Sequence, residues 1–309
     1  MKKIDIVKAK RMTQNIWPII RMVLVVGIAF MILYPLFVKF STSIKSDADM
    51  HDPTVFFIPK NPTLGNFRTV IQSVSYLPTL LQTILFVGCV ALMQLISCTL
   101  TAYGFARFRF PGRNFLFALV VFTLVIPPQA ILLPLYLKFR FFNVLEVFKF
   151  GGTLSGIALT DTVWPFVLLS ITAVAFKNGL YIFMLRQHFY NVPSSLEEAA
   201  YIDGCGVFKT FYRIILPGAI PMLITVFLFA FVWQWNDFYY TQMLAPSLPT
   251  LNVKLAGMTL SGLDSTAGSM MESMLQAPKF LLLIAPLVVL YLFTQRFFTE
   301  SVERSGLVG

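Results

Sequence analysis

The residues best able to do chemistry in this chain stand in one polar segment that ends at Gly204. Ser195 is followed three residues later by Glu198, the spacing of a capping box, in which each side chain satisfies a free backbone N–H at a helix start. Pro193 stops a preceding helix, and Gly204 suits the left-handed position that ends one. The pattern predicts a helix of about nine residues, roughly 13 Å long, and a second helix after Gly206.

The composition of this short helix suits binding to a partner protein. Ala199 and Ala200 expose little bulk, so the helix can sit deep in a groove of a partner protein. An ordinary helix at a membrane interface has a similar composition and stays open as an alternative. The two histidines, His51 and His188, are isolated, and three cysteines form no disulfide framework. The sequence therefore predicts no metal site and no catalytic residue.

The elements that carry this segment are apolar. Of 309 residues, 57% are hydrophobic and 12% are charged, whereas about a quarter of the residues in soluble domains are charged. This composition excludes a soluble globular enzyme and a disordered chain. The formal net charge is +10, and we interpret it as the Lys and Arg excess of a membrane protein's cytoplasmic loops. We expect lipid around the chain and no nucleic acid as a partner.

The apolar stretches predict an all-α, polytopic membrane protein with six transmembrane helices, since about 20 residues cross a bilayer. The density of Lys and Arg, highest in the turn 107–113, places both termini in the cytoplasm. The predicted helices lie near residues 17–39, 79–106, 115–137, 163–189, 215–239 and 279–299.

Three regions follow from this topology. Residues 1–78 comprise an N-terminal cytoplasmic tail, the first transmembrane helix and an external loop. Residues 79–299 form a five-helix core whose cytoplasmic loop spans 191–217. Residues 300–309 form a cytoplasmic C-terminal tail.

The polar segment also has the spacing of a known motif. Glu-Ala-Ala, three residues, Gly, nine residues and then Ile-x-Leu-Pro matches the EAA loop of bacterial importer permeases at every position. Two acidic residues fit the fuller version of the motif. The matching residues are Glu197, Glu198, Ala199, Ala200, Asp203, Gly204, Ile214, Leu216 and Pro217.

Over nearly its whole length the chain resembles the carbohydrate branch of the ABC importer permeases, especially the second permease of the maltose-type pair. Tyr103–Arg113 resembles that family's turn between spans two and three, Phe183–Phe189 the end of its fourth span, and Trp235–Phe238 the end of its fifth. The tail departs from the family, because Ser305–Gly309 lacks the usual lysine.

The resemblance implies a type I ABC importer permease fold and a transport subunit, not an enzyme, in which the EAA helix rests in a cleft of a separate ATPase. The motif residues then couple the two proteins: Glu198 caps the helix and meets a basic partner, and Gly204 permits the turn between the two helices. In agreement, the sequence has no G-x-x-x-x-G-K-[ST] pattern for nucleotide phosphates.

The resemblance also implies the partners. They are a second homologous permease, two ATPase subunits that bind ATP and Mg²⁺, an extracytoplasmic solute-binding protein and a carbohydrate substrate. This chain itself binds no cofactor. The expected location is the prokaryotic cell membrane.

Polar side chains at membrane depth mark the candidate substrate path, because they are costly facing lipid. Gln129 follows two prolines in the third span, where a kink frees carbonyls for a cavity; a buried, hydrogen-bonded Gln is the alternative. Trp233, Trp235, Asn236 and Asp237 close the fifth span. There, rings can stack on sugar faces and polar groups can bind hydroxyls; an interfacial aromatic belt is the alternative.

Lys177 is the ionisable residue deepest in a predicted span. It stands nine residues from Arg186, about 13.5 Å by helix rise, near the midplane of a core of about 30 Å. One interpretation is a cationic wall that favours an anionic saccharide such as a uronate oligomer. The alternative is a snorkelling or ion-paired structural lysine.

Three rival functions make different demands on the sequence. An ion-coupled secondary transporter needs acidic pairs and internal repeats, yet Asp237, near a helix end, is the only carboxylate in the predicted spans. An intramembrane enzyme needs a nucleophile–base pair or metal ligands, which the spans lack. Another branch of ABC importers, such as one for amino acids or phosphonates, remains the third alternative.

Overall fold

The computed structural model describes residues 2–143, 157–258 and 265–306. These residues are mostly helical and include no β-strand; one isolated bridge pairs Phe142 with Ile157. Contacts divide the chain into two units, Met1–Ser73 with Thr259–Ala285, and Val74–Met258 with Pro286–Gly309. The predicted boundary after residue 78 falls inside a helix, and residues 307–309 of the predicted tail lie outside the described residues.

The first unit contains the predicted first span and a compact segment after it. Residues Trp17–Ser43 form a helix long and apolar enough to cross a membrane. Beyond it, Lys45 Nζ donates to the carbonyl oxygens of Val55 (2.7 Å) and Phe56 (3.0 Å), and the Asp49 carboxylate accepts from the backbone of Asn61 (2.8 Å). The helices that begin in this unit are α1 (Lys2–Ser43), α2 (Asp47–His51), α3 (Gly65–Ser73) and α15 (Ser265–Gly306), the last of which continues into the second unit.

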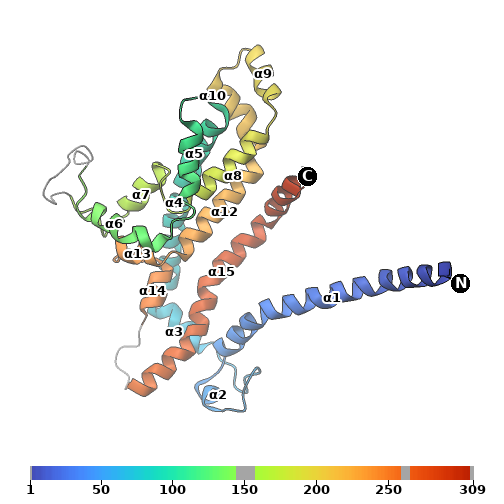
Figure 1. Cartoon of the computed structure of the whole chain (residues 1–309). Coiled ribbons are helices and arrows are strands. Elements are labelled where there is room, and N and C mark those ends of the chain that lie inside the picture. The colour runs from blue at the N-terminus through green and yellow to red at the C-terminus, as the bar shows by residue number, and fades with distance from the viewer. Residues whose placement is uncertain (1, 144–156, 259–264, 307–309) are drawn as a thin grey trace. The chain divides into compact units, whose positions relative to one another are not determined.

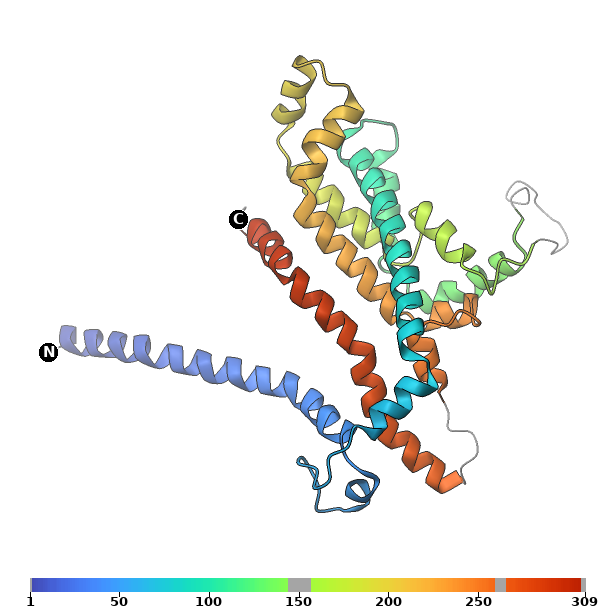
Figure 2. The ribbon, with the colours of Figure 1, turned by 180° about the vertical axis from the view of Figure 1, so that it is seen from behind.

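The second unit is built around α4, which packs against α7, α8 and α12 (Figures 1 and 2). One face of α4 is buried, as at Val87, Ala91, Cys98 and Ala102, a spacing that keeps side chains on the same side of a helix. The helices that begin in this unit are α4 (Tyr76–Arg107), α5 (Arg113–Phe122), α6 (Pro128–Arg140), α7 (Trp164–Ile171), α8 (Asn178–Asn191), α9 (Ser194–Ile202), α10 (Val207–Thr210), α11 (Leu216–Gly218), α12 (Ile220–Asn236), α13 (Tyr239–Leu244) and α14 (Leu251–Gly257).

The third and fourth predicted spans are not continuous helices, and that expectation is wrong. Residues 115–137 are divided between α5 and α6, because Pro127 and Pro128 cannot continue a helix. Residues 163–189 are divided between α7 and α8, where Ala173 (φ 58°) and Lys177 (φ 75°) adopt left-handed backbone, which no helical residue can have.

Three helices are long and apolar enough to span a membrane in the described part of the chain: Trp17–Ser43, Tyr76–Arg107 and Ser273–Arg296. They coincide with the first, second and sixth predicted spans. A fourth arises if Val207–Gly218 and Ile220–Asn236, bent by 77° at their junction, count as one. The full set of six spans therefore stays a prediction.

Candidate functional site

The predicted cytoplasmic helix exists as α9, which has nine residues (Ser194–Ile202). Gly204 has φ +78° as predicted, and α10 follows at Val207. Figure 1 shows α9 and α10 together at one end of the second unit. The predicted capping box is wrong: the helix begins at Ser194 with Pro193 as its N-cap and has no side-chain cap. The extended backbone of Pro193 starts the helix one residue early, so Ser195 lies within it.

The two adjacent glutamates of α9 differ in burial and in their contacts. Glu197 is buried, and its Oε1 lies 3.1 Å from Arg107 Nε and accepts a 3.4 Å hydrogen bond from Tyr103 Oη. Arg107 Nη2 also donates to Val192 O (2.6 Å). Glu198 is exposed. One glutamate therefore fixes α9 to the end of α4, while the other is free to meet a partner.

The outward face of α9 and α10 carries large apolar side chains beside exposed polar ones. Of the remaining motif residues, Ala199, Asp203 and Gly204 are exposed and Ala200 is buried. Near them Ile202 and Phe208 are 87% and 90% exposed. Large exposed apolar side chains mark interaction sites. The motif spacing alone did not identify these two, although their apolar type in a predicted cytoplasmic loop is a usable signal.

The Ile-x-Leu-Pro end of the motif forms a bend. Ile214 lies in a π-helical turn, Phe211–Ile215, and Leu216 and Pro217 begin the short α11. The chain then turns by 77° into α12. Short π-helical turns inside helices often occur at functional sites. This bend joins the surface helices α9 and α10 to the long helix α12.

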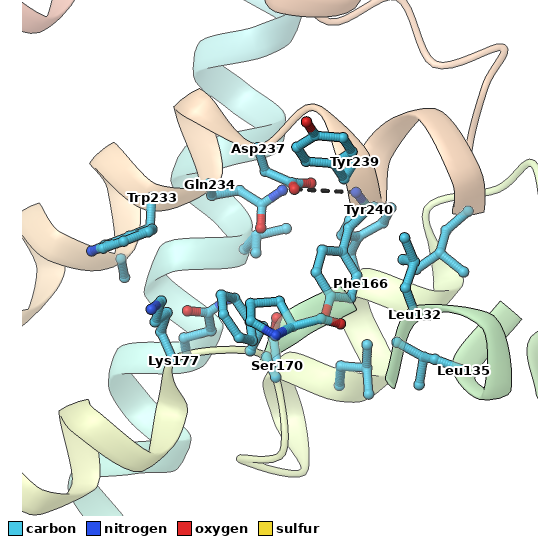
Figure 3. Close-up of a pocket in the computed structure, with 18 of the residues that line it drawn as sticks. Leu132, Leu135, Phe166, Ser170, Lys177, Trp233, Gln234, Asp237, Tyr239 and Tyr240 are labelled. Carbon is cyan, nitrogen blue, oxygen red and sulfur yellow. Dashed lines mark hydrogen bonds between the residues drawn. The ribbon is translucent and has the colours of Figure 1, made fainter. Parts of the chain in front are cut away.

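A cavity of about 300 Å³ lies elsewhere in the same unit, between α4, α6, α7, α12 and α13 (Figure 3). Five of the six residues predicted for the substrate path line it: Gln129, Lys177, Trp233, Asn236 and Asp237. The sixth, Trp235, is buried and stacks on Phe231 with ring centroids 5.7 Å apart. It therefore belongs to the core of the unit.

Lys177 reaches the cavity from the break between α7 and α8, where it is the N-cap residue of α8. Its Nζ lies 4.2 Å from the centroid of the Trp233 ring and 4.6 Å from that of Phe176. No carboxylate forms an ion pair with it among the residues that the structure describes. Lys177 was predicted to lie inside a continuous helix. It lies instead at the start of α8, where it lines the cavity.

The polar side chains at the end of α12 already have partners. Asp237 accepts from the backbone N–H groups of Tyr240 (3.2 Å) and Thr241 (2.9 Å), and its Oδ2 also accepts from the Thr241 hydroxyl (2.9 Å). Asn236 Nδ2 donates to Val232 O (2.8 Å). Gln129 lines the cavity and is exposed. The Asp237 carboxylate therefore starts α13, which limits its capacity to bind a hydroxyl.

Sequence reasoning missed several polar groups of the cavity, among them Gln94, Ser170 and Gln234. Gln94 of α4 is 5% exposed and Ser170 of α7 is 1% exposed. Ser170 Oγ and Gln234 Nε2 are buried without a hydrogen-bond partner in the described structure. A glutamine inside the long apolar run of α4 is the signal that identifies Gln94. Such groups are costly unless a ligand or water satisfies them.

A loop contact fixes the end of α13 beside the cavity. The backbone N–H of Asp161 donates to Leu244 O (2.6 Å), and its carboxylate accepts from Ser247 N (2.8 Å) and Ser247 Oγ (2.7 Å). These hydrogen bonds from Ser247 hold the pKa of Asp161 below its ordinary value. Asp161 therefore stays ionised and keeps the two loops joined at neutral pH.

Comparison with known proteins identifies relatives that are membrane components of transport systems. The family model described as "Binding-protein-dependent transport system inner membrane component" matches residues 98–303. The osmoprotective compounds uptake permease protein GgtD of Synechocystis sp. is 30% identical over 284 residues, which are 90% of this chain and 88% of that protein. The arabinooligosaccharides transport system permease protein AraQ of Halalkalibacterium halodurans is 26% identical over 298 residues, 94% of this chain and 98% of that protein.

A solved structure shares the fold. It is described as the crystal structure of a bacterial ABC transporter involved in the import of the acidic polysaccharide alginate. The TM-score is 0.74 at 23% identity, and the match covers 93% of this chain and 98% of that chain. The likeness confirms the predicted all-α permease fold.

Proposed function

Because this chain belongs to the family of binding-protein-dependent transport system inner membrane components, we propose that it is the permease subunit of an ATP-driven importer of sugars or oligosaccharides. It forms half of the translocation path and hydrolyses no ATP itself. A second homologous permease, two ATPase subunits with their ATP and Mg²⁺, and an extracytoplasmic solute-binding protein complete the importer. All six predicted spans, with both termini in the cytoplasm, belong to this proposal.

The observation that carries the coupling role is the geometry of α9. The helix has the EAA spacing, is anchored from behind by Arg107, and presents Glu198 and Ala199 outward beside the exposed Ile202 and Phe208. An anchored helix whose exposed face carries both apolar and charged side chains can be held by a partner and transmit the partner's movement as a rigid body. We assign this face to the cleft of the ATPase, and the bend at Phe211–Ile215 to the transfer of its motion into α12.

The carbohydrate assignment is supported by the name of one relative, by the description of the fold neighbour and by the cavity. One relative transports arabinooligosaccharides and the fold neighbour imports alginate. The cavity combines ring faces, as at Trp233 and Tyr239, with buried polar groups such as Gln94 and Ser170, the combination expected of a small-molecule site. A permease of another ABC importer branch is the alternative, and an ion-coupled secondary transporter a weaker one.

Two valine substitutions test the coupling role. Gly204 has φ +78°, and nothing lies within 4 Å of a Cβ added there, so Gly204→Val acts through the backbone alone, which β-branched residues do not place in the left-handed region. Gly206 has φ −76° and ψ 165°, which valine adopts readily, so Gly206→Val is the matched control. We expect Gly204→Val to insert normally but to lose binding-protein-stimulated ATPase activity and uptake in proteoliposomes.

Gly206→Val should retain both activities. Normal coupled uptake by correctly inserted Gly204→Val would overturn the role assigned to the α9–α10 turn.

A further inference from the structure

We propose that the cavity binds the carboxylate of an acidic saccharide, such as a uronic-acid oligosaccharide, at Lys177. The inference rests on the proposed function and names the substrate class of the same cavity.

The first argument is the unsatisfied charge. Among the residues that the structure describes, Lys177 is the one basic residue that lines the cavity. No hydrogen bond or ion pair of its ammonium group occurs within that part of the chain. Instead it lies over the rings of Trp233 and Phe176. A cation–π contact orients an ammonium group but leaves N–H donors free. An anion that enters the cavity thus meets a positioned cation with no competing carboxylate on it.

The second argument is the backbone at this position. Lys177 has φ 75°, a conformation that Gly and Asn tolerate best, and the next two residues of the chain are Asn178 and Gly179. A lysine at a left-handed position costs stability relative to either of them, and such strain gathers at functional sites. The side chain of Lys177 therefore contributes something that the fold itself does not need.

The third argument concerns the acidic residue of the cavity. Asp237 is the one carboxylate among the described lining residues, and a free carboxylate there would repel an anion. Both of its oxygens instead accept hydrogen bonds from the first turn of α13, at Tyr240 and Thr241. These bonds occupy both oxygens of the Asp237 side chain, so that Asp237 holds the start of α13 and leaves Lys177 to recognise the ligand.

The remaining lining suits a sugar ring attached to that carboxylate. Figure 3 shows Lys177 and Trp233 at one end of the cavity and Leu132 and Leu135 at the other. Trp233 is 48% exposed, so the part of its ring that Lys177 does not cover can contact a sugar ring. Between the ends, the buried hydroxyl of Ser170 has no partner within the described structure, and a sugar hydroxyl can satisfy it.

A matched pair of ligands tests the inference. A uronic-acid trisaccharide and its carboxyl-reduced counterpart differ in charge but share linkage and size. Uptake and equilibrium binding of both are measured with the complete importer for wild type, Lys177→Gln and Lys177→Arg. Lys138→Gln, an exposed lysine of α6 that does not line the cavity, is the control. Loss of one charge-assisted hydrogen bond changes affinity about tenfold or more.

We expect wild type to prefer the acidic trisaccharide, Lys177→Gln to lose that preference by about tenfold or more, and Lys177→Arg to keep most of it. Lys138→Gln should behave as wild type. An equal preference for the acidic trisaccharide in wild type and in a correctly assembled Lys177→Gln importer would overturn the inference. In that case, ATP-driven uptake of either trisaccharide would leave the proposed function intact. Absence of ATP-driven uptake of any saccharide would overturn both.

Discussion

At the scale of single residues, the neighbouring glutamates of α9 have separable roles. Glu197 is buried against Arg107 and Tyr103, whereas Glu198 is exposed. Glu197→Gln removes the negative charge beside a largely buried guanidinium, which costs about 1–3 kcal/mol. We expect it to lower the apparent melting temperature of the purified permease. Arg107→Gln should have a similar effect, and the two changes together should cost less than their sum.

Glu198→Gln is the matched change one residue along the chain. Because Glu198 is exposed, the melting temperature should stay unchanged while coupling to the ATPase weakens. Equal destabilisation by the two substitutions would contradict the division between an inward and an outward glutamate.

The sequence predicted the extent of α9 and the left-handed Gly204, because proline and glycine impose local constraints that tertiary packing seldom overrides. It did not predict the inward turn of Glu197. That orientation depends on Arg107, which is 90 residues away in the chain and was noted in the sequence only as a marker of topology. The capping box predicted from Ser195 and Glu198 is wrong for a local reason. Pro193 is the N-cap, so the helix begins at Ser194 and Ser195 already lies within it.

At the scale of elements, the two broken spans contact each other at Gly179. A Cβ added there would lie 2.9 Å from Val120 O and even closer to Thr123 Oγ1, so the start of α8 approaches the end of α5 as only glycine allows. We expect Gly179→Ala to cost about 1–3 kcal/mol by overpacking, measured as a lower melting temperature, and to disturb the cavity through the adjacent Lys177.

Gly88→Ala offers a control for Gly179→Ala, since Gly88 lies in α4 and a Cβ there meets nothing within 4 Å. It should leave stability unchanged or slightly raised, because alanine favours a helix. Unaltered stability of Gly179→Ala would show that the two helices separate easily.

Hydropathy located the three helices that are long and apolar enough to span a membrane in the described part of the chain, but it could not show where the third and fourth predicted spans break. Apolar composition is the same on either side of the prolines between α5 and α6. The two prolines gave a local signal, which was interpreted as a kink. The break between α7 and α8 contains no proline, and it occurs at Ala173 and Lys177, two left-handed residues of types that do not favour that conformation.

At the scale of the whole molecule, the predicted topology sets which surfaces face the outside. Ile58 and Phe208 are 84% and 90% exposed, so cysteines at either position are equally reachable by a reagent. In a background without Cys89, Cys98 and Cys205, a membrane-impermeant maleimide should label Ile58→Cys in intact cells. It should label Phe208→Cys only after the membrane is permeabilised.

The opposite labelling pattern would contradict cytoplasmic termini. Labelling of both positions in intact cells would contradict an odd number of crossings between them.

Composition alone identified the class of the molecule, because 57% hydrophobic residues with 12% charge fit only a lipid environment. The motif spacing identified its family, and the match over residues 98–303 agrees. The grouping of helices into a unit around α4 was not predictable, since it depends on pairwise packing that periodicity does not encode.

The left-handed backbone of Lys177 has a consequence for how this position changes under selection. A library of variants screened for thermal stability alone should replace Lys177 with glycine or asparagine, which fit φ 75° without strain. The same library screened for growth on an acidic saccharide should retain lysine or arginine. The two selections would therefore enrich different residues at this position, and sequencing the surviving populations would measure the difference.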